Sequence, residues 1–170
     1  MQRPEPTEYH EFYSTYVDKV PAGDIFEILK TGLDETVRLF SQCSGDRETY
    51  AYEPGKWTVR ELLGHMTDTE RLFGFRALWI ARGDQQNQPG MDQDLWARES
   101  NAAERPLAEQ LEEFSLVRRA NLALLGGFDP SVWGKTGNAS GFSFTVRAFP
   151  FILAGHEIHH RLVLAERYLA

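Results

Sequence analysis

Apolar residues recur at the three- and four-residue spacing of an amphipathic helix in four separate segments of the chain. These segments cover residues 24–43, 58–82, 106–126 and about 145–168. No segment shows the strict alternation of apolar and polar residues that marks a strand, so we expect no sheet. Amphipathic helices must bury their apolar faces against one another. The pattern therefore predicts an all-α fold, a four-helix bundle, in which residues 1–170 form a single domain.

The ends of the predicted helices carry residues that suit those positions. Thr58 precedes the second segment and Glu61 follows three positions later, which is the pattern of a capping box. The same segment ends at Arg82 and Gly83, where a cation and a glycine suit the exposed carbonyl groups. Pro106 is expected to be the first residue of the third helix, because its missing N–H is not needed there.

Three polar segments lie outside the predicted helices. Residues 1–21 contain several prolines, and we interpret them as an N-terminal arm. Three of its residues are expected to dock it onto the helices: Tyr13, Tyr16 and Val17. Residues 84–105 form a long connection with Trp96 near its middle, and connections of this length are often functional. Residues 129–141 form a second polar connection, leading into the fourth helix.

The charge and the cysteine content exclude several classes of protein. The 18 basic and 25 acidic residues give a net charge of −7, without the basic surface of a nucleic-acid-binding protein. The single cysteine, Cys43, excludes an intramolecular disulfide and thiolate-rich metal sites, and we place it on the apolar face of the first helix. We find no secretory signal and no apolar run near the roughly 20 residues of a membrane span. We therefore expect a cytoplasmic protein without nucleic-acid or membrane partners.

Two histidines occupy successive positions in the apolar stripe of the fourth predicted helix. The stripe consists of Val146, Phe149, Leu153, His156, His160, Val163 and Arg167. Imidazoles four residues apart lie on one face of a helix, close enough to bind one ion. His65 lies at the edge of the apolar stripe of the second predicted helix, where it can reach the pair if the two helices pack together. The three histidines are therefore candidate metal ligands.

The histidine spacing has two interpretations. A single histidine on an apolar face is usually a core residue with a hydrogen-bond partner. Two neutral imidazoles buried side by side leave ring nitrogens without partners, and one divalent ion would satisfy both. Spacing alone leaves both interpretations open. Histidine ligands completed by water are compatible with zinc, nickel, iron or manganese, so the metal is not identified.

Residues 156–160 also match the H-E-x-x-H pattern of zincin metalloproteases, with Glu157 as the general base. Such enzymes generally take a third ligand downstream of the motif, and the ten residues after His160 contain no histidine. Two other roles explain Glu157 equally well: a solvated carboxylate on the helix surface, or a partner of Arg161 at the i+4 position. The protease interpretation is therefore the weakest of those considered.

Four stretches of the chain resemble the DinB/YfiT-like superfamily. They are PGKWTVRELLGHMTDTERLFGFRALWIARGD (residues 54–84), PGMDQDLWA (89–97), LEEFSLVRRANLALL (111–125) and AGHEIHHRLVLAERYL (154–169). The two histidine-bearing stretches are the specific part of the resemblance.

The resemblance implies an up-down-down-up bundle with a long crossover between the second and third helices. It also implies a divalent metal ion held by His65, His156 and His160, with open positions for water or substrate. Several members of this superfamily are thiol-dependent S-transferases, others resemble hydrolases, and many have no assigned reaction. The resemblance thus implies an enzyme acting on a small molecule, with a low-molecular-weight thiol as cosubstrate. A homodimer is expected as well. The alternative is a metal-binding or sensing bundle without catalysis.

Further polar residues are candidates for a pocket beside the metal, each with an ordinary structural explanation. Glu70 falls on the apolar stripe of its helix, where it orients a histidine N–H. The alternative is exposure to solvent, or an ion pair with Arg71 or with a lysine or arginine elsewhere in the chain. Asn121 is either a satisfied core group or a pocket donor. Packing, solvation or surface charge is the alternative for the remaining candidates: Trp57, Asp68, Asp92, Asp94, Trp96, Arg147, His159 and Arg161. His10, in the arm, is interpreted as incidental.

Overall fold

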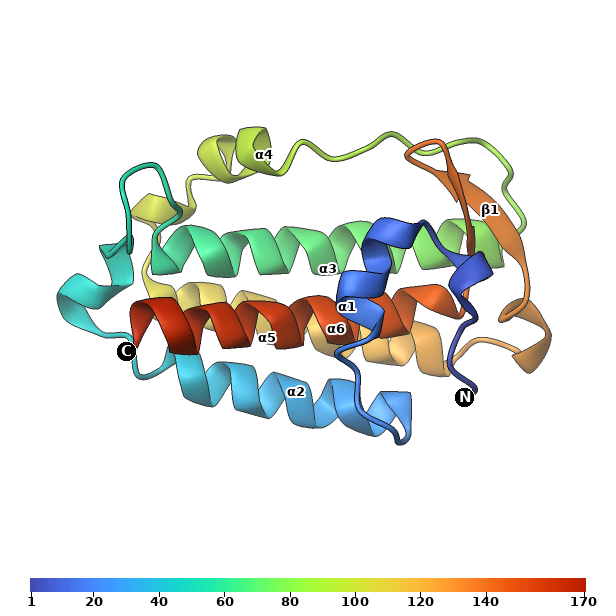
Figure 1. Ribbon diagram of the computed structural model, residues 1–170, viewed down its shortest axis with the longest axis horizontal. Helices are drawn as coiled ribbons and strands as arrows, with labels where there is room; N and C mark the ends of the chain where they lie inside the picture. The colour runs from blue at the N-terminus through green and yellow to red at the C-terminus, as the bar shows by residue number, and fades with distance from the viewer.

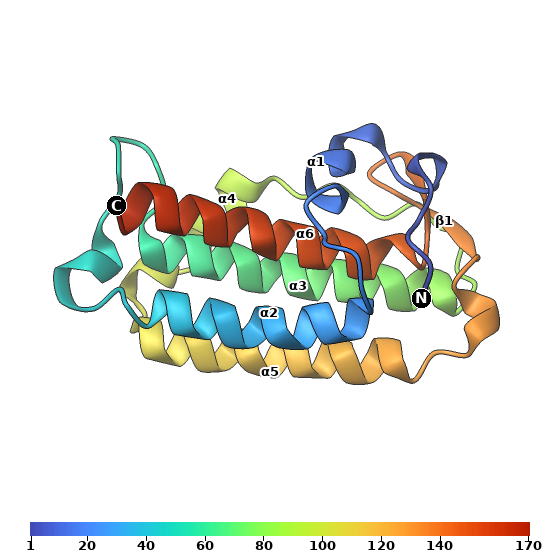
Figure 2. The same ribbon diagram turned by 60° about the horizontal axis from the view of Figure 1, so that its bottom comes forward.

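The computed structural model describes all 170 residues, and most of them are helical. The four long helices are α2 (Ile25–Phe40), α3 (Val59–Ala81), α5 (Leu107–Gly126) and α6 (Ala148–Val163), and a π-helical turn (Leu164–Tyr168) continues α6. They lie side by side along the long axis of the molecule (Figures 1 and 2). Each of the four predicted helices is present.

Short elements fill the segments between the long helices. They are α1 (Ser14–Val17), α4 (Gln93–Glu99) and five 3₁₀ turns (Pro6–Glu8, Glu11–Tyr13, Gly45–Thr49, Ala102–Glu104 and Pro130–Val132). In Figure 1, α3 and α5 both begin at the end of the bundle that holds the C-terminus. The long connection between them, containing α4, passes back along the outside of the bundle.

The capping box at Thr58 places the start of α3 correctly. The Thr58 hydroxyl accepts a hydrogen bond from the Glu61 N–H, and the Glu61 carboxylate accepts one from the Thr58 N–H at 2.8 Å. Asp24 caps α2 by accepting from the backbone N–H groups of Phe26 and Glu27. Pro106 is the N-cap of α5, so it stands one position before the place we predicted.

The prediction that no sheet is present is wrong. Strands β1 (Thr136–Ala139) and β2 (Phe142–Thr145) form an antiparallel hairpin, in which Thr145 pairs with Thr136. α6 consequently begins at Ala148 and not near Thr145. Ser140 and Gly141 form the turn, with φ of 54° and 82°, as in a type I′ hairpin loop. β1 contains glycine and asparagine, which are rare in strands, so its sequence does not predict a strand.

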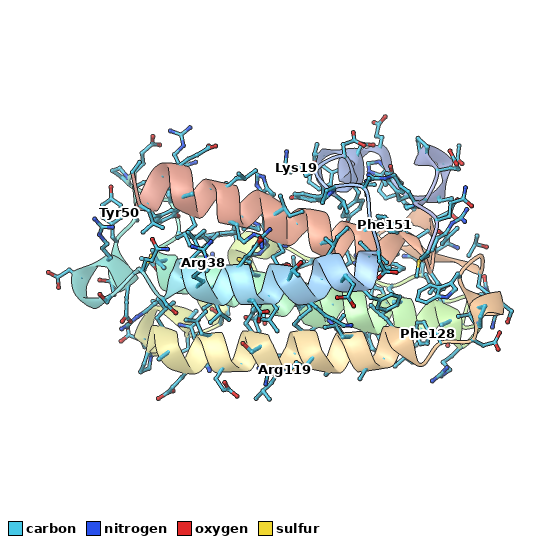
Figure 3. All side chains as sticks on the ribbon, turned by 90° about the horizontal axis from the view of Figure 1, so that it is seen from below. Lys19, Arg38, Tyr50, Arg119, Phe128 and Phe151 are labelled. Carbon is cyan, nitrogen blue, oxygen red and sulfur yellow. The ribbon has the colours of Figure 1, made fainter.

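The core consists of two apolar clusters at opposite ends of the bundle. The larger cluster includes Phe128 and Phe151, which lie toward the end that carries the hairpin (Figure 3). The smaller one includes Phe40, Phe114 and Leu164. Cys43 belongs to this smaller cluster. The prediction that it lies on the first helix is wrong, because α2 ends at Phe40. None of the helices is long and apolar enough to cross a membrane.

The N-terminal arm is packed against the bundle. Its Tyr9, Val17 and Val20 side chains are buried, and α1 lies on α6. The Glu8 carboxylate accepts hydrogen bonds from Thr145 and Arg147, and these contacts lower its pKa to about 2. The arm therefore contributes to the core as well as to the surface.

Gly155 lets the arm approach α6 closely, because a β-carbon there would fall on the carbonyl oxygen of Tyr16. We expect Gly155→Ala to displace the arm and to lower the free energy of unfolding by about 1–3 kcal/mol, the usual effect of overpacking. Hydrogen exchange of residues 14–20 should become faster. Gly126→Ala, on α5 where a β-carbon meets no atom within 4 Å, is the control. Unchanged exchange in the Gly155 variant would contradict this role.

Candidate metal centre

Three histidine rings meet at one point between α3 and α6. His65 lies on α3, and His156 and His160 lie one turn apart on α6. The Nε2 atom of His156 is 3.0 Å from the Nε2 atoms of both His65 and His160. One potential ligand atom from each of the three side chains lies within 4.8 Å of the other two. The structure thus brings together the three histidines that the sequence singled out.

The three imidazoles are buried, and their surroundings favour the neutral form. Burial lowers the pKa of His65 to about 4. Burial and the neighbouring rings of His160 and His65 hold the pKa of His156 well below its usual value. Burial, with His65, does the same for His160. Neutral rings present nitrogen lone pairs, which is the form in which histidine binds a metal.

The nitrogen contacts suit a shared ion better than hydrogen bonding among the rings. A ring nitrogen either donates one hydrogen bond or accepts one, so Nε2 of His156 cannot serve both neighbours. Two ligand atoms with bonds of about 2.0–2.1 Å to one metal lie at most about 4.2 Å apart, and separations of 3.0 Å satisfy this limit. The third pair, His65 and His160, lies within 4.8 Å, so at most a small approach of these two rings is needed for all three nitrogens to bind one divalent ion. Nδ1 of His160 is buried without a partner, so no protein group fixes that ring's tautomer.

Aromatic rings enclose the three histidines. The Trp57 ring lies 4.6 Å from the His65 ring, centroid to centroid. Tyr16, from the arm, contacts the edge of His156 at 5.2 Å and also faces His159. His159 is half-buried beside His160 but does not join the set of three. Apolar rings around a site limit water access and lower the local dielectric.

A buried ionic network centred on Arg118 joins the four long helices. Arg118, on α5, donates to Glu70 of α3 at 2.6 Å and to Glu157 of α6 at 2.7 Å. It also donates to the Leu29 carbonyl of α2, and Thr36 of α2 donates to Glu157 at 2.6 Å. Burial alone would lower the pKa of Arg118, but the two carboxylates raise it above its usual value.

This network corrects our expectation for Glu157 and decides between the alternatives for Glu70 and Asn121. Glu157 is neither solvated nor paired with Arg161, because its carboxylate is buried between Thr36 and Arg118. Glu70 pairs with Arg118, a cation elsewhere in the chain, and not with Arg71 or a histidine. Asn121 is a satisfied core group, whose amide donates to both the backbone and the carboxylate of Glu70. With Glu157 engaged in this way, the geometry gives no support to a general base of the zincin type.

Two cavities flank the histidines. The polar cavity, of about 390 Å³, is lined by Lys56, Trp57, Asp94, His159 and His160, among others. The aromatic cavity, of about 370 Å³, contacts His65 and His156 and is lined by Phe12, Tyr13, Tyr16, Phe73 and Arg76, among others. Gln93, at the start of α4, lines both. Small-molecule sites have volumes of this size, and the predicted functional role of the long connection is compatible with this position.

The remaining candidates have structural contacts. Asp68 and Arg71 belong to a surface cluster with Glu113, and Arg147 binds Glu8. Arg161 pairs with Glu35, Asp92 caps α4, and Trp96 is exposed. His10 caps a 3₁₀ turn, and its ring contacts Phe142 at a tilt of 43°.

Two buried arginines were missed by the sequence analysis. Arg118 lies on the same helix face as Phe114, Asn121 and Leu125, at spacings of four, three and four residues. Arg76 lies on one face of α3 with His65, separated from it by eleven residues, or about three turns. The signal that could have found them is a charged residue in phase with an apolar stripe.

Comparisons with known proteins identify the family and find similar folds. The family model of the DinB superfamily matches residues 28–164. YfiT from Bacillus subtilis, described as a probable metal-dependent hydrolase with an unusual four-helix bundle topology, superposes with a TM-score of 0.75. The match covers 97% of this chain and 90% of YfiT at 14% identity. A mycothiol-dependent maleylpyruvate isomerase has a TM-score of 0.70 at 10% identity, covering 86% of this chain but 61% of the isomerase. No relative is found among curated proteins.

Proposed function

Since the chain belongs to the DinB superfamily, we propose that it is a metal-dependent enzyme whose divalent ion is held by His65, His156 and His160. The observation that carries this proposal is the approach of the three buried imidazoles to one point. Three protein ligands leave coordination positions open, which is typical of catalytic sites and not of structural ones.

The reaction we propose is either transfer of a low-molecular-weight thiol to a small molecule or hydrolysis of a small molecule. The description of one similar structure as a probable metal-dependent hydrolase supports hydrolysis, and that of the other as a mycothiol-dependent isomerase supports the use of a thiol. When bound, a divalent ion would supply Lewis-acid chemistry, by polarising a carbonyl group or by lowering the pKa of a bound thiol or water. The two cavities offer separate space for two reactants on either side of the histidines.

The protein's own residues position the site and shield the histidine rings. The Arg118 network fixes α6 against α2, α3 and α5 at Glu157, the residue next to His156. Trp57 and Tyr16 cover the histidine rings. Lys56, Asp94 and His159 supply polar contacts in the polar cavity. An up-down-down-up order of the helices is part of the proposal, and the chain path in Figure 1 supports it.

We expect turnover to require the metal. The protein would be stripped with a chelator, reloaded separately with zinc, nickel, iron(II) or manganese, and assayed for thiol conjugation and for amide and ester hydrolysis. Activity should disappear on stripping and return with at least one metal. Stoichiometric metal binding without turnover in either reaction class would instead favour a non-catalytic metal-binding bundle. Failure to bind any metal would refute the proposed site.

A further inference from the structure

Arg76 is a buried cation without a counter-ion. Its side chain is 1% exposed, comparable to Arg118. Arg118 contacts two carboxylates, whereas Arg76 forms no ion pair. It donates to two neutral oxygens, the Pro89 carbonyl at 2.8 Å and Ser140 Oγ at 3.0 Å, and the neutral Tyr13 hydroxyl also lies beside the guanidinium. Its Nε–H is buried without any partner. Burying an unpaired charge is unfavourable in free energy. An anionic ligand would neutralise the guanidinium, and no carboxylate of the chain does so.

The unpaired guanidinium belongs to the wall of the aromatic cavity. It is the only lysine or arginine among the lining residues, and no aspartate or glutamate lines the cavity. On α3, His65, Thr69, Leu72 and Arg76 follow one another at spacings of four, three and four residues, and all of them line it. The cavity therefore follows one face of α3 from His65 to Arg76. These two residues are about 16.5 Å apart along the helix axis, at 1.5 Å per residue.

The walls between these two ends are mostly aromatic. The arm contributes Phe12, Tyr13 and Tyr16, and α3 contributes Phe73, whose ring lies 5.4 Å from the guanidinium carbon. Rings of this kind pack well against a flat apolar ligand. Side chains on a helix lean toward its N-terminus, so Arg76 is directed toward the histidine end of the cavity.

The guanidinium is held in place by two segments outside the bundle. Ser140, at the hairpin turn, has a left-handed φ of 54°, and its N–H donates to the Gln88 carbonyl at 2.8 Å. Pro89 follows in the same connection and supplies the second acceptor. Both neutral oxygens bind the same terminal nitrogen of Arg76 and leave Nε–H free.

We propose that the aromatic cavity binds a small carboxylic acid with an apolar, aromatic body, and that Arg76 is the counter-ion of its carboxylate. A single guanidinium matches a monoanion, whereas a phosphate dianion would need further cations that this cavity lacks. The other end of the ligand then faces His65 and His156. That orientation rests on the proposed function, because it places the reacting group at the metal.

The first test compares two probes of nearly equal shape. Wild-type protein, as purified, would be titrated by calorimetry with 3-phenylpropionate and with its neutral amide, 3-phenylpropionamide. Since hydrogen bonds to charged groups are worth about 1.5–3 kcal/mol, the carboxylate should bind at least tenfold more tightly. Equal affinities for the two probes would overturn the proposal.

Variants separate Arg76 from the metal as the carboxylate's partner. Arg76→Gln should bring the affinities for the two probes to within about twofold. Arg71→Gln, on the same helix but outside the aromatic cavity, should preserve the wild-type preference. An unchanged preference in Arg76→Gln would mean that another group, such as the metal, holds the carboxylate.

A further measurement needs no stable variant. The side-chain Nε–H resonance of Arg76 should shift on adding 3-phenylpropionate to the wild-type protein and should stay in place with the amide. A resonance that does not move with saturating carboxylate would overturn the proposal. Metal content, measured on the same samples, tests the proposed function separately. Carboxylate binding without metal leaves this inference standing, and metal binding without a carboxylate preference removes it.

Discussion

Replacing His156 with alanine is expected to reduce bound divalent metal from about one ion per chain to nearly none. His156 has the largest expected effect because its Nε2 atom contacts those of both His65 and His160. A ligand that binds only the folded state stabilises it by about 2.7 kcal/mol at 100 times its Kd. Added zinc or nickel should therefore raise the Tm of the wild type and leave that of the variant unchanged. Elemental analysis and thermal unfolding measure both effects.

His159→Ala is the matched control for this prediction. His159 lies on the same helix, between the two α6 histidines, but outside the group of three. Its replacement should leave the metal content at the wild-type level. Equal metal content in the His156 and His159 variants would refute the assignment of His156 as a ligand.

Replacing Arg118 with methionine is expected to lower the free energy of unfolding by about 3–5 kcal/mol. The substitution preserves much of the apolar volume, but it leaves the carboxylates of Glu70 and Glu157 buried without their cation. Urea unfolding at neutral pH measures the loss. Arg71→Met, which breaks ion pairs of a half-exposed side chain, should cost about 1 kcal/mol or less.

A triple variant distinguishes charge burial from lost packing. Glu70→Gln, Glu157→Gln and Arg118→Met together remove all three charges, so most of the stability should return. A triple variant less stable than Arg118→Met alone would show that the hydrogen bonds of the network, and not its charge balance, decide stability. A loss below about 1 kcal/mol in Arg118→Met would contradict the importance of the network altogether.

The Arg118 network also explains how the core is divided. The larger apolar cluster contains Phe73, Leu125 and Ala154, and the smaller contains Met66 and Phe114. On α3, α5 and α6 the polar side chains Glu70, Arg118, Asn121 and Glu157 stand between the members of the two clusters. A polar layer with fixed partners favours one register of the helices, because a shift along the bundle would leave charges buried without partners.

The sequence predicted the helices because their signals are local. The Thr58 capping box and the 3–4 spacing of apolar residues depend on neighbours within a few positions. The two α6 histidines were found for the same reason. The hairpin was missed because Thr136 and Thr145 pair across a turn, and β1 contains residues that rarely occur in strands.

Glu157 was misplaced because α6 is not an amphipathic surface helix, and the face that carries Glu157 packs against Thr36 of α2 and Arg118 of α5. The arm covers a further face, which the sequence pattern assigns to solvent, so all residues from Ala148 to Glu157 are buried. The arm can lie there because Gly155 has no side chain. No periodicity within α6 predicts this, because it depends on a segment more than 130 residues earlier in the chain.

The sequence by itself determined the four helices, most of their ends and the three histidines worth testing. It did so because helix formation and side-chain spacing are set by residues close together in the chain. Only the tertiary structure decided that His65 meets the α6 pair, that Glu157 binds Arg118, and that Arg76 is buried without a carboxylate partner. These are contacts between distant segments, and the partner of a charged or titratable group depends on which helices pack together and on what covers them.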